Sequence, residues 1–244
     1  MSRPAGFIEI RQGTDVCWLN EGGLSTLSSE VFEPEFWQSR DAVTGSASGR
    51  GITWFVRDGE RQLVLRHYRR GGLFGRLVKD LYAGITPANS RAMRELSLLA
   101  AMRKEGLPVP EPIGARFTRH GALYRADLLI GRIASASDLL TVLQLRPLGD
   151  DQWRQIGAMI RRFHRTGIDH TDLNIHNILL DDQGKSWLID FDKCSKRSPG
   201  SWPQTNLARL LRSLQKEKRL HPDLHWSEQD WPILLDGYNR QDQP

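Results

Sequence analysis

The stretch HTDLNIHNILL, residues 170–180, places Asp172 and Asn177 five positions apart and follows Asn177 with an apolar run. Further on, SWLIDFD, residues 186–192, ends a second short apolar run at Asp190. Because DDQGK separates the two runs, the pattern predicts a hairpin that starts after Asn177 and finishes at Asp190. Two carboxylates and one carboxamide are therefore expected to meet at one end of this hairpin.

Such a set of side chains suits phosphoryl transfer from a nucleotide. Asn177 and Asp190 offer the hard oxygen ligands that Mg²⁺ prefers, and we expect them to hold the ion on the phosphates of ATP. Asp172 is expected to orient the attacking hydroxyl and to accept its proton. The predicted cofactors are therefore ATP and Mg²⁺.

The elements around this hairpin predict an α+β fold in two lobes. Strand pairs are expected at 52–68, across the Asp58-Gly59 turn, and at 112–133, with a helix at about 90–105 between them. The first 40 or so residues read as short strands and turns. Residues 151–167 predict an amphipathic helix, and the chain from about 204 is helical and basic. We therefore expect a β-rich N-terminal lobe over 1–134 and a mostly helical C-terminal lobe over 135–244.

Composition narrows the classes of partner. Cys17 and Cys194 are the two cysteines among 244 residues and form no CxxC, which disfavours a disulfide framework or zinc site and fits a reducing compartment. No run of about 20 apolar residues or secretory signal is present in the sequence. The net charge is +5, and basic residues are concentrated at 61–79 and 193–219, which suggests a phosphate, nucleic acid or anionic membrane as partner. Nucleic acid is disfavoured because no basic sheet carries interleaved aromatic residues.

Glycines precede the first strand pair in GSASGRG, residues 45–51. Gly45, Gly49 and Gly51 can bend a loop tightly and present backbone N–H groups to a phosphate. This loop is therefore a second candidate phosphate site.

The motifs HTDLNIHN and DFD resemble the HRDLxxxxN and DFG motifs of the protein-kinase superfamily, in the same order and at similar spacing. The resemblance implies a bilobal kinase-like fold, with the glycine loop over the phosphates. It places Arg66 where the superfamily has its phosphate-binding lysine, makes Glu95 its ion-pair partner and gives His170 an architectural role. No APE motif or long activation segment follows DFD, which favours a small-molecule kinase over a protein kinase.

Together with LRHYRRGGLFGRLVKDLY (65–82) and GRGITWFV (49–56), these motifs resemble the 3-deoxy-D-manno-octulosonic acid (Kdo) kinases of lipopolysaccharide-core synthesis. The resemblance implies phosphorylation of a Kdo hydroxyl, at O-4, on the Kdo-lipid A precursor. It also implies a peripheral protein at the anionic cytoplasmic face of the bacterial inner membrane. Lys193 and Arg197 then become candidates for binding the sugar carboxylate, and four bases become candidates for lipid contact: Arg69, Arg70, Arg76 and Lys79.

Alternative functions remain at this point. A heptose kinase of the same pathway or a compact protein kinase would differ in the acceptor alone. A membrane-associated pseudokinase scaffold is favoured by Arg66 in place of lysine. The joint presence of Asp172, Asn177 and Asp190 argues against it, because a scaffold has no need of all three.

Overall fold

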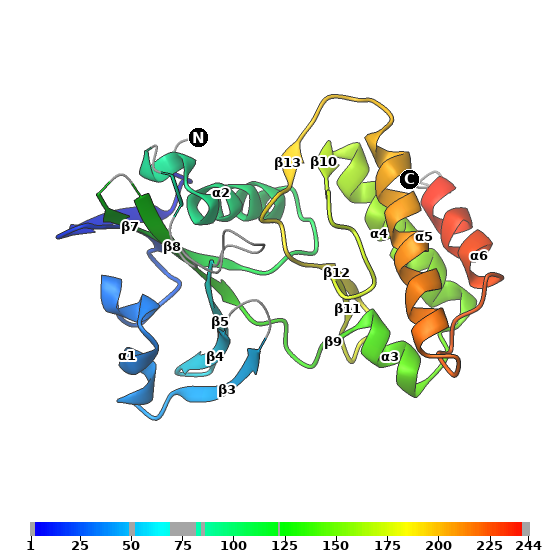
Figure 1. Cartoon of the computed structure of the whole chain (residues 1–244), viewed down its shortest axis with the longest axis horizontal. Helices are drawn as coiled ribbons and strands as arrows, with labels where there is room; N and C mark the ends of the chain where they lie inside the picture. Colours follow the sequence, from blue (N-terminus) through cyan, green and yellow to red (C-terminus); the bar gives the residue numbers. More distant parts are fainter. Residues whose placement is uncertain (1–2, 49–51, 69–81, 84–85, 122, 241–244) are drawn as a thin grey trace. The chain divides into compact units, whose positions relative to one another are not determined.

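A computed structural model of the chain describes residues 3–48, 52–68, 82–83, 86–121 and 123–240. The chain divides into two compact units (Figure 1). Unit 1 comprises Met1–Lys104 and Pro110–Ile133, and unit 2 comprises Glu105–Val109 and Ala134–Pro244. The sequence placed one lobe boundary near 134. In the structure the chain also changes unit before and after the short segment 105–109, which belongs to unit 2.

Unit 1 is built on an antiparallel sheet. Among the described residues this sheet has eight strands in the order β1-β2-β7-β8-β5-β4-β3, with β6 paired to β8. The strands are β1 (Phe7–Gln12), β2 (Asp15–Asn20), β3 (Val43–Ser48), β4 (Ile52–Asp58), β5 (Arg61–His67), β6 (Tyr82–Ala83), β7 (Pro112–His120) and β8 (Leu123–Gly131). The predicted strand pairs are confirmed as the β4–β5 and β7–β8 hairpins.

One face of this sheet is covered by α2 (Arg91–Lys104), which packs on β7 and β8 (Figure 1). The helix buries Leu96, Leu99 and Met102, as their spacing predicts. A short 3₁₀ helix, η3 (Pro87–Asn89), precedes it, and Gly106 follows with a φ of 71°. The left-handed conformation that glycine tolerates best marks the end of the helix.

The opposite face carries a second apolar cluster that includes Cys17, Phe32, Trp37 and Leu65. Two short helices contribute to it: η1 (Ser29–Phe32) and α1 (Pro34–Gln38). The expectation of strands and turns throughout the first 40 residues is therefore wrong for 29–38. The Ser28 side chain caps η1 and a proline opens α1, both of which favour helix starts.

Unit 2 is mostly helical. Its helices are α3 (Leu139–Leu145), α4 (Asp150–Arg165), α5 (Trp202–Leu220) and α6 (Asp230–Asn239). Short strands connect them: β9 (Ser137–Asp138), β10 (Ile168–Asp169), β11 (Ile178–Leu180), β12 (Ser186–Leu188) and β13 (Ser195–Lys196). The β11–β12 pair confirms the predicted hairpin, and β9 adds to its other edge.

The core of unit 2 lies around α4. Its predicted apolar face is confirmed as buried, with Trp153, Ile160 and Phe163 each 1% exposed. On another side, α4 meets α6 backbone to backbone: a Cβ built on Gly157 would lie 2.0 Å from the Leu234 carbonyl oxygen. Only glycine fits such a contact, so this helix pair needs residues without side chains at the crossing.

Candidate catalytic site

The loop between β10 and β11 carries Asp172 and Asn177. The Asn177 side-chain nitrogen donates to the Asp172 carbonyl oxygen over 3.0 Å, and the Asn174 side-chain nitrogen donates to the same oxygen over 2.9 Å. Leu173, between them in the sequence, is 1% exposed and anchors the loop in the core of unit 2. Asp172 and Asn177 are thus brought together by the fold of the loop itself.

The end of the β11–β12 hairpin joins this loop. The Ile189 backbone nitrogen donates to the Asn177 carbonyl oxygen over 3.0 Å, so the residue before Asp190 is tied to Asn177. Asp190 itself has a φ of 65°, a left-handed conformation that is uncommon for a residue with a side chain. Strained backbone of this kind is often found at functional sites and turns the chain sharply after β12.

His170 holds the loop to the hairpin. Its Nε2 lies 2.9 Å from the Ile189 carbonyl oxygen, and because a carbonyl only accepts, Nε2 must carry the proton. The residue is 1% exposed, and burial lowers the pKa of its imidazole. Its ring meets Phe191 edge-on, with ring centroids 4.9 Å apart. A neutral, buried ring in these contacts acts as a structural support.

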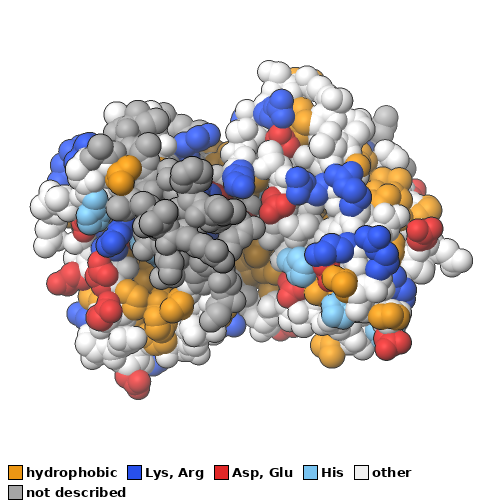
Figure 2. Space-filling model, in the orientation of Figure 1, with side chains coloured by type: hydrophobic (Ala, Val, Ile, Leu, Met, Phe, Trp, Pro, Cys, Tyr) orange, Lys and Arg blue, Asp and Glu red, His pale blue; other side chains and the backbone are white. Residues whose placement is uncertain are grey.

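The helix α5 supports the same loop through one of its faces. The Asn206 side-chain oxygen accepts from the His170 backbone nitrogen over 3.0 Å, and Ser213 Oγ accepts from the Ile175 backbone nitrogen over 3.3 Å. Between them, Arg209 Nη1 donates to Asp172 Oδ1 over 3.1 Å. Lys and Arg side chains gather over α5 on the displayed surface of unit 2 (Figure 2). None of these three supports was predicted, because the sequence gives no spacing rule that links a helix to a loop more than 30 residues earlier.

The two predicted carboxylate-binding residues differ in their surroundings. Arg197 Nη1 donates to Asp169 Oδ2 over 2.9 Å, and Asp169 is itself 3% exposed. The Asn206 side-chain nitrogen donates to the other oxygen of Asp169 over 2.9 Å. Lys193 is exposed. The contact of Arg197 with Asp169 therefore helps to hold the loop in place. This geometry does not favour the proposed contact between Arg197 and the sugar carboxylate.

In unit 1, Arg66 and Glu95 form an ion pair of 2.7 Å between Arg66 Nη2 and Glu95 Oε2. The Tyr68 hydroxyl donates to the same carboxylate oxygen. Burial, together with the adjacent Glu95 charge, raises the pKa of Tyr68 well above its usual value and keeps the phenol neutral. Tyr68 was not predicted, although it directly follows β5 and its position two residues after Arg66 puts it on the same face of the sheet.

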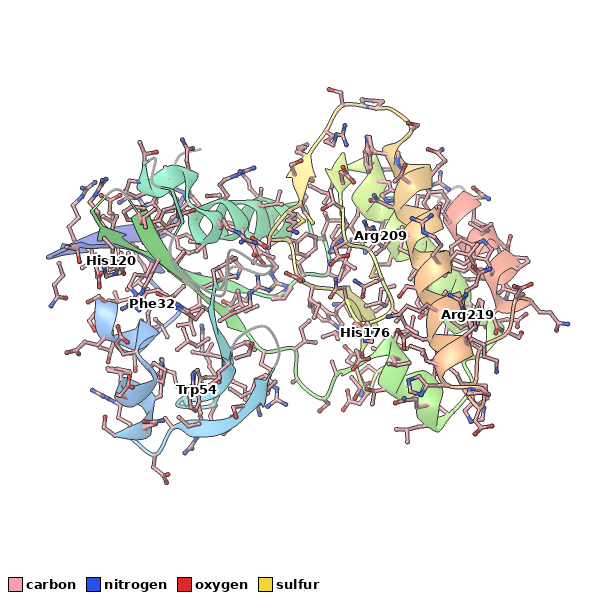
Figure 3. All side chains as sticks on the ribbon, viewed as in Figure 1. Phe32, Trp54, His120, His176, Arg209 and Arg219 are labelled. Atoms are coloured by element: carbon pink, nitrogen blue, oxygen red, sulfur yellow. The ribbon has the colours of Figure 1, made fainter. Side chains whose placement is uncertain are left out.

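A cavity of about 400 Å³ lies on the opposite face of this sheet, with Phe32, Trp54 and His120 in its wall (Figure 3). At its base, Arg116 Nε donates to Asp127 Oδ2 over 2.8 Å. Burial by itself lowers the pKa of Arg116, but the carboxylates of Asp127 and Glu33 outweigh it and raise the pKa above its usual value. Because neighbouring residues of a strand point to opposite faces, the cavity is separate from the surface that carries Arg66.

The predicted glycine loop is corrected at its first residue. Gly45 lies inside β3, paired with Phe55, and a Cβ built there would make an ordinary 3.5 Å contact with the Phe55 ring. Strand pairing therefore replaces the turn expected at this position. Gly49 and Gly51 lie outside the described residues, as do four proposed lipid contacts: Arg69, Arg70, Arg76 and Lys79.

The donor set in unit 2 fits a magnesium ion. The Asn177 side-chain nitrogen is used on the Asp172 carbonyl oxygen, which leaves the Asn177 side-chain oxygen as the ligand atom. Asp190 adds a carboxylate from the adjoining turn. Two hard oxygen donors are what Mg²⁺ commonly takes from a protein when phosphates and water complete its shell.

Comparison with known proteins places these observations in a family context. A model of the lipopolysaccharide kinase (Kdo/WaaP) family matches residues 34–238. A 3-deoxy-D-manno-octulosonic acid kinase of Vibrio parahaemolyticus is 48% identical over 94% of this chain and 96% of its own length. The proteins of the same name from Vibrio cholerae and Actinobacillus succinogenes are 48% and 42% identical, over 89% and 95% of this chain and 92% and 99% of their own lengths.

Proposed function

Because the chain belongs to the lipopolysaccharide kinase (Kdo/WaaP) family, we propose that it transfers the γ-phosphoryl group of ATP to a hydroxyl of Kdo in lipopolysaccharide-core synthesis. The observation that carries this proposal is identity of 42–48% to Kdo kinases over nearly the whole length of both chains. The acceptor is the Kdo-lipid A precursor and the hydroxyl is O-4. The expected family resemblance is confirmed.

Asp172 is the group proposed to act on the acceptor. Its carboxylate orients the sugar hydroxyl and takes its proton as the hydroxyl oxygen bonds to the γ-phosphorus and the bond to the β-phosphate oxygen of ATP breaks. Asn174 and Asn177 hold the backbone at Asp172 in position. Holding the reacting groups in line is the main contribution that a protein makes to this reaction.

Asn177 and Asp190 would hold Mg²⁺, which neutralises charge on the transferring phosphates when bound. The hydrogen bond from Ile189 to Asn177 fixes the two ligands relative to one another. His170 braces the same junction from the core side. The left-handed turn at Asp190 would direct its carboxylate toward the ion.

Arg66 is proposed to contact the nucleotide phosphates in place of the usual lysine. Its forked head group suits bridging between a carboxylate and a phosphate, a geometry that lysine cannot reproduce. Glu95, 2% exposed, and the neutral Tyr68 fix the guanidinium from the protein side. A fixed guanidinium is favourable for catalysis because little reorganisation is needed when charge develops.

The place of action is proposed to be the cytoplasmic face of the inner membrane, with the protein bound peripherally. No described helix is long and apolar enough to cross a membrane. The acceptor is a lipid, and the net charge of +5 favours an anionic surface.

The proposed function is tested by label transfer. Purified protein is incubated with γ-labelled ATP, Mg²⁺ and, in separate reactions, the Kdo-lipid A precursor, the same lipid without Kdo, or a heptose-bearing acceptor, and NMR of the product locates the phosphate. Label on the Kdo-bearing lipid alone is the expected result. Label on heptose-bearing acceptors instead would replace Kdo by heptose, and no transfer to any acceptor with ATP still bound would favour the pseudokinase scaffold.

A further inference from the structure

The exposed basic residues of α5 form a stripe, and the first of them, Arg209, contacts Asp172. At roughly 100° per residue, the four fall within an arc of roughly 80° and extend about 15 Å along the helix. This α5 basic stripe consists of Arg209, Arg212, Lys216 and Arg219. Figure 3 shows Arg209 and Arg219 on α5, and Figure 2 shows the Lys and Arg side chains at this surface.

Two acids contact the stripe. Asp172 pairs with Arg209 over 3.1 Å, and the buried Glu217 pairs with Lys216 over 3.2 Å. His176 and His221 also lie near Glu217, at 3.6 and 3.7 Å. Four bases against two acids leave the stripe with excess positive charge. An ordinary solvated helix face can carry such an excess, but this one begins at the residue proposed to activate the acceptor hydroxyl.

Arg209 has the properties of a substrate contact. The side chains of Arg209 and Asp172 are each 47% exposed, so a solute can reach both. The hydrogen bond to Asp172 uses Nη1, and a guanidinium has five N–H donors in one plane. Arg209 can therefore keep Asp172 oriented and bind a carboxylate alongside it. Arg197, the residue expected in this role, is instead paired with Asp169 at the base of the loop.

We infer that the α5 basic stripe recognises the anionic acceptor, with Arg209 on the sugar carboxylate and Arg212 and Arg219 on the lipid phosphates. The inference rests on the proposed function, since it is Kdo that carries a carboxylate on the ring to be phosphorylated. A carboxylate held by Arg209 places a hydroxyl of the same ring beside Asp172. The phosphates of the lipid lie farther from that hydroxyl, as Arg212 and Arg219 lie farther along α5.

The carboxylate contact is tested with two acceptors, Kdo-lipid A precursor and its Kdo methyl ester. For each enzyme form, kcat/KM is measured on both. The wild type should prefer the carboxylate by about 10- to 100-fold, as for a charge-assisted bidentate contact. Arg209→Ala should reduce this preference to about 3-fold or less, and Arg209→Lys should keep part of it. Because the ratio is taken within one variant, any loss from a displaced Asp172 cancels.

Lys185→Ala provides the matched control. Lys185 is exposed at the turn of the β11–β12 hairpin, the opposite end from Asn177 and Ile189, and its loss changes the net charge equally. This variant should keep the wild-type preference. A wild-type preference retained in Arg209→Ala, or absent from the wild type, overturns the inference while leaving Kdo phosphorylation intact. Failure of the wild type to phosphorylate either acceptor overturns the proposed function and the inference with it.

The phosphate contacts are tested with Arg212→Ala/Arg219→Ala against Lys104→Ala/Lys185→Ala, which removes equal charge outside the stripe. The double variant Arg212→Ala/Arg219→Ala should raise the KM for the lipid acceptor by about 3- to 10-fold at low salt and leave the KM for ATP unchanged. Removing the lipid phosphates should abolish the difference between the two double variants. Equal KM values for the phosphorylated lipid in both double variants would contradict the assignment of Arg212 and Arg219.

Discussion

The Arg66–Glu95 pair of unit 1 and the Asp172–Arg209 pair of unit 2 hold their charges in opposite ways. Glu95 is 2% exposed and also accepts from the buried Tyr68 hydroxyl. Asp172 and Arg209 are each 47% exposed at the surface. The first pair joins a strand to a helix, and the second joins a loop to a helix.

This difference separates fixed charges from exchangeable ones. A buried pair loses much stability when one partner is removed, because the remaining charge is left in a poor solvent. An exposed pair is worth about 0–1 kcal/mol, because water replaces either partner readily. The unit 1 pair therefore suits the fixed positioning of one group, and the unit 2 pair suits a contact that an incoming acceptor shares.

The largest predicted effect is on activity in unit 2. Asp172→Asn should lower kcat by about 10²- to 10⁴-fold, because the hydroxyl loses the group that accepts its proton. Nucleotide binding, measured by titration calorimetry, should stay within a factor of about 3, and stability should change by about 1 kcal/mol or less. Asp182→Asn, at an exposed turn, is the control. Equal losses of binding and activity in Asp172→Asn would contradict the assigned role.

Asp172 could be predicted from the sequence because its partners are local. The loop holds it through Asn174 and Asn177, both within five residues, and the hairpin that brings Asp190 is signalled by two apolar runs and a turn. The hairpins of unit 1, α2 and α4 were predicted for the same reason. The spacing of apolar residues and the positions of turn residues predict the structure of short stretches of chain.

Distant contacts could not be predicted in this way. Asn206 and Arg209 reach the loop from α5, which the sequence described only as helical and basic. The ion pair that engages Arg197 joins residues 28 positions apart. Gly45 was assigned to a loop because glycine favours turns, whereas pairing across to β4 determines its conformation. Each of these depends on tertiary packing, which the spacing of residues does not encode.

The second largest effect is on stability in unit 1. Glu95→Ala should lower the free energy of unfolding by about 2–4 kcal/mol, because the partly buried Arg66 loses its ion pair and the buried Tyr68 hydroxyl loses its acceptor. Urea unfolding measures the change. Glu105→Ala, which removes an exposed carboxylate from a 3.2 Å pair with Lys196, is the matched control and should cost less than about 1 kcal/mol. Similar losses in the two variants would remove the distinction between buried and exposed pairs.

Acid should weaken unit 2 through His164. Burial lowers the pKa of this residue from 6.5 to about 4. Between these values the unfolded chain binds the proton and the folded protein does not, so stability is full above pH 6.5 and is lost as the pH falls toward 4. At pH 5 the loss is about 2 kcal/mol. Urea unfolding of the wild type and of His164→Gln at pH 7 and 5 measures this loss. An equal decrease in the free energy of unfolding in both proteins would exclude His164 as its source.

The smallest effect concerns the exposed pair itself. Arg209→Ala should change the free energy of unfolding by less than about 1 kcal/mol, since water replaces the guanidinium at Asp172. Thermal unfolding of this variant beside Lys185→Ala is the measurement. A loss of about 3 kcal/mol or more would place the Asp172–Arg209 pair with the structural pairs and end the contrast with unit 1.

The most direct measurement is the KM for each substrate in Arg66→Lys and Arg209→Ala. Arg66→Lys should raise the KM for ATP by about 10-fold and leave the KM for the Kdo lipid within a factor of about 3. Arg209→Ala should do the reverse, raising the KM for the Kdo lipid by about 10- to 100-fold. Such a crossover supports fixed nucleotide contacts in unit 1 and exchangeable acceptor contacts in unit 2. Two variants that change the same KM would contradict this division.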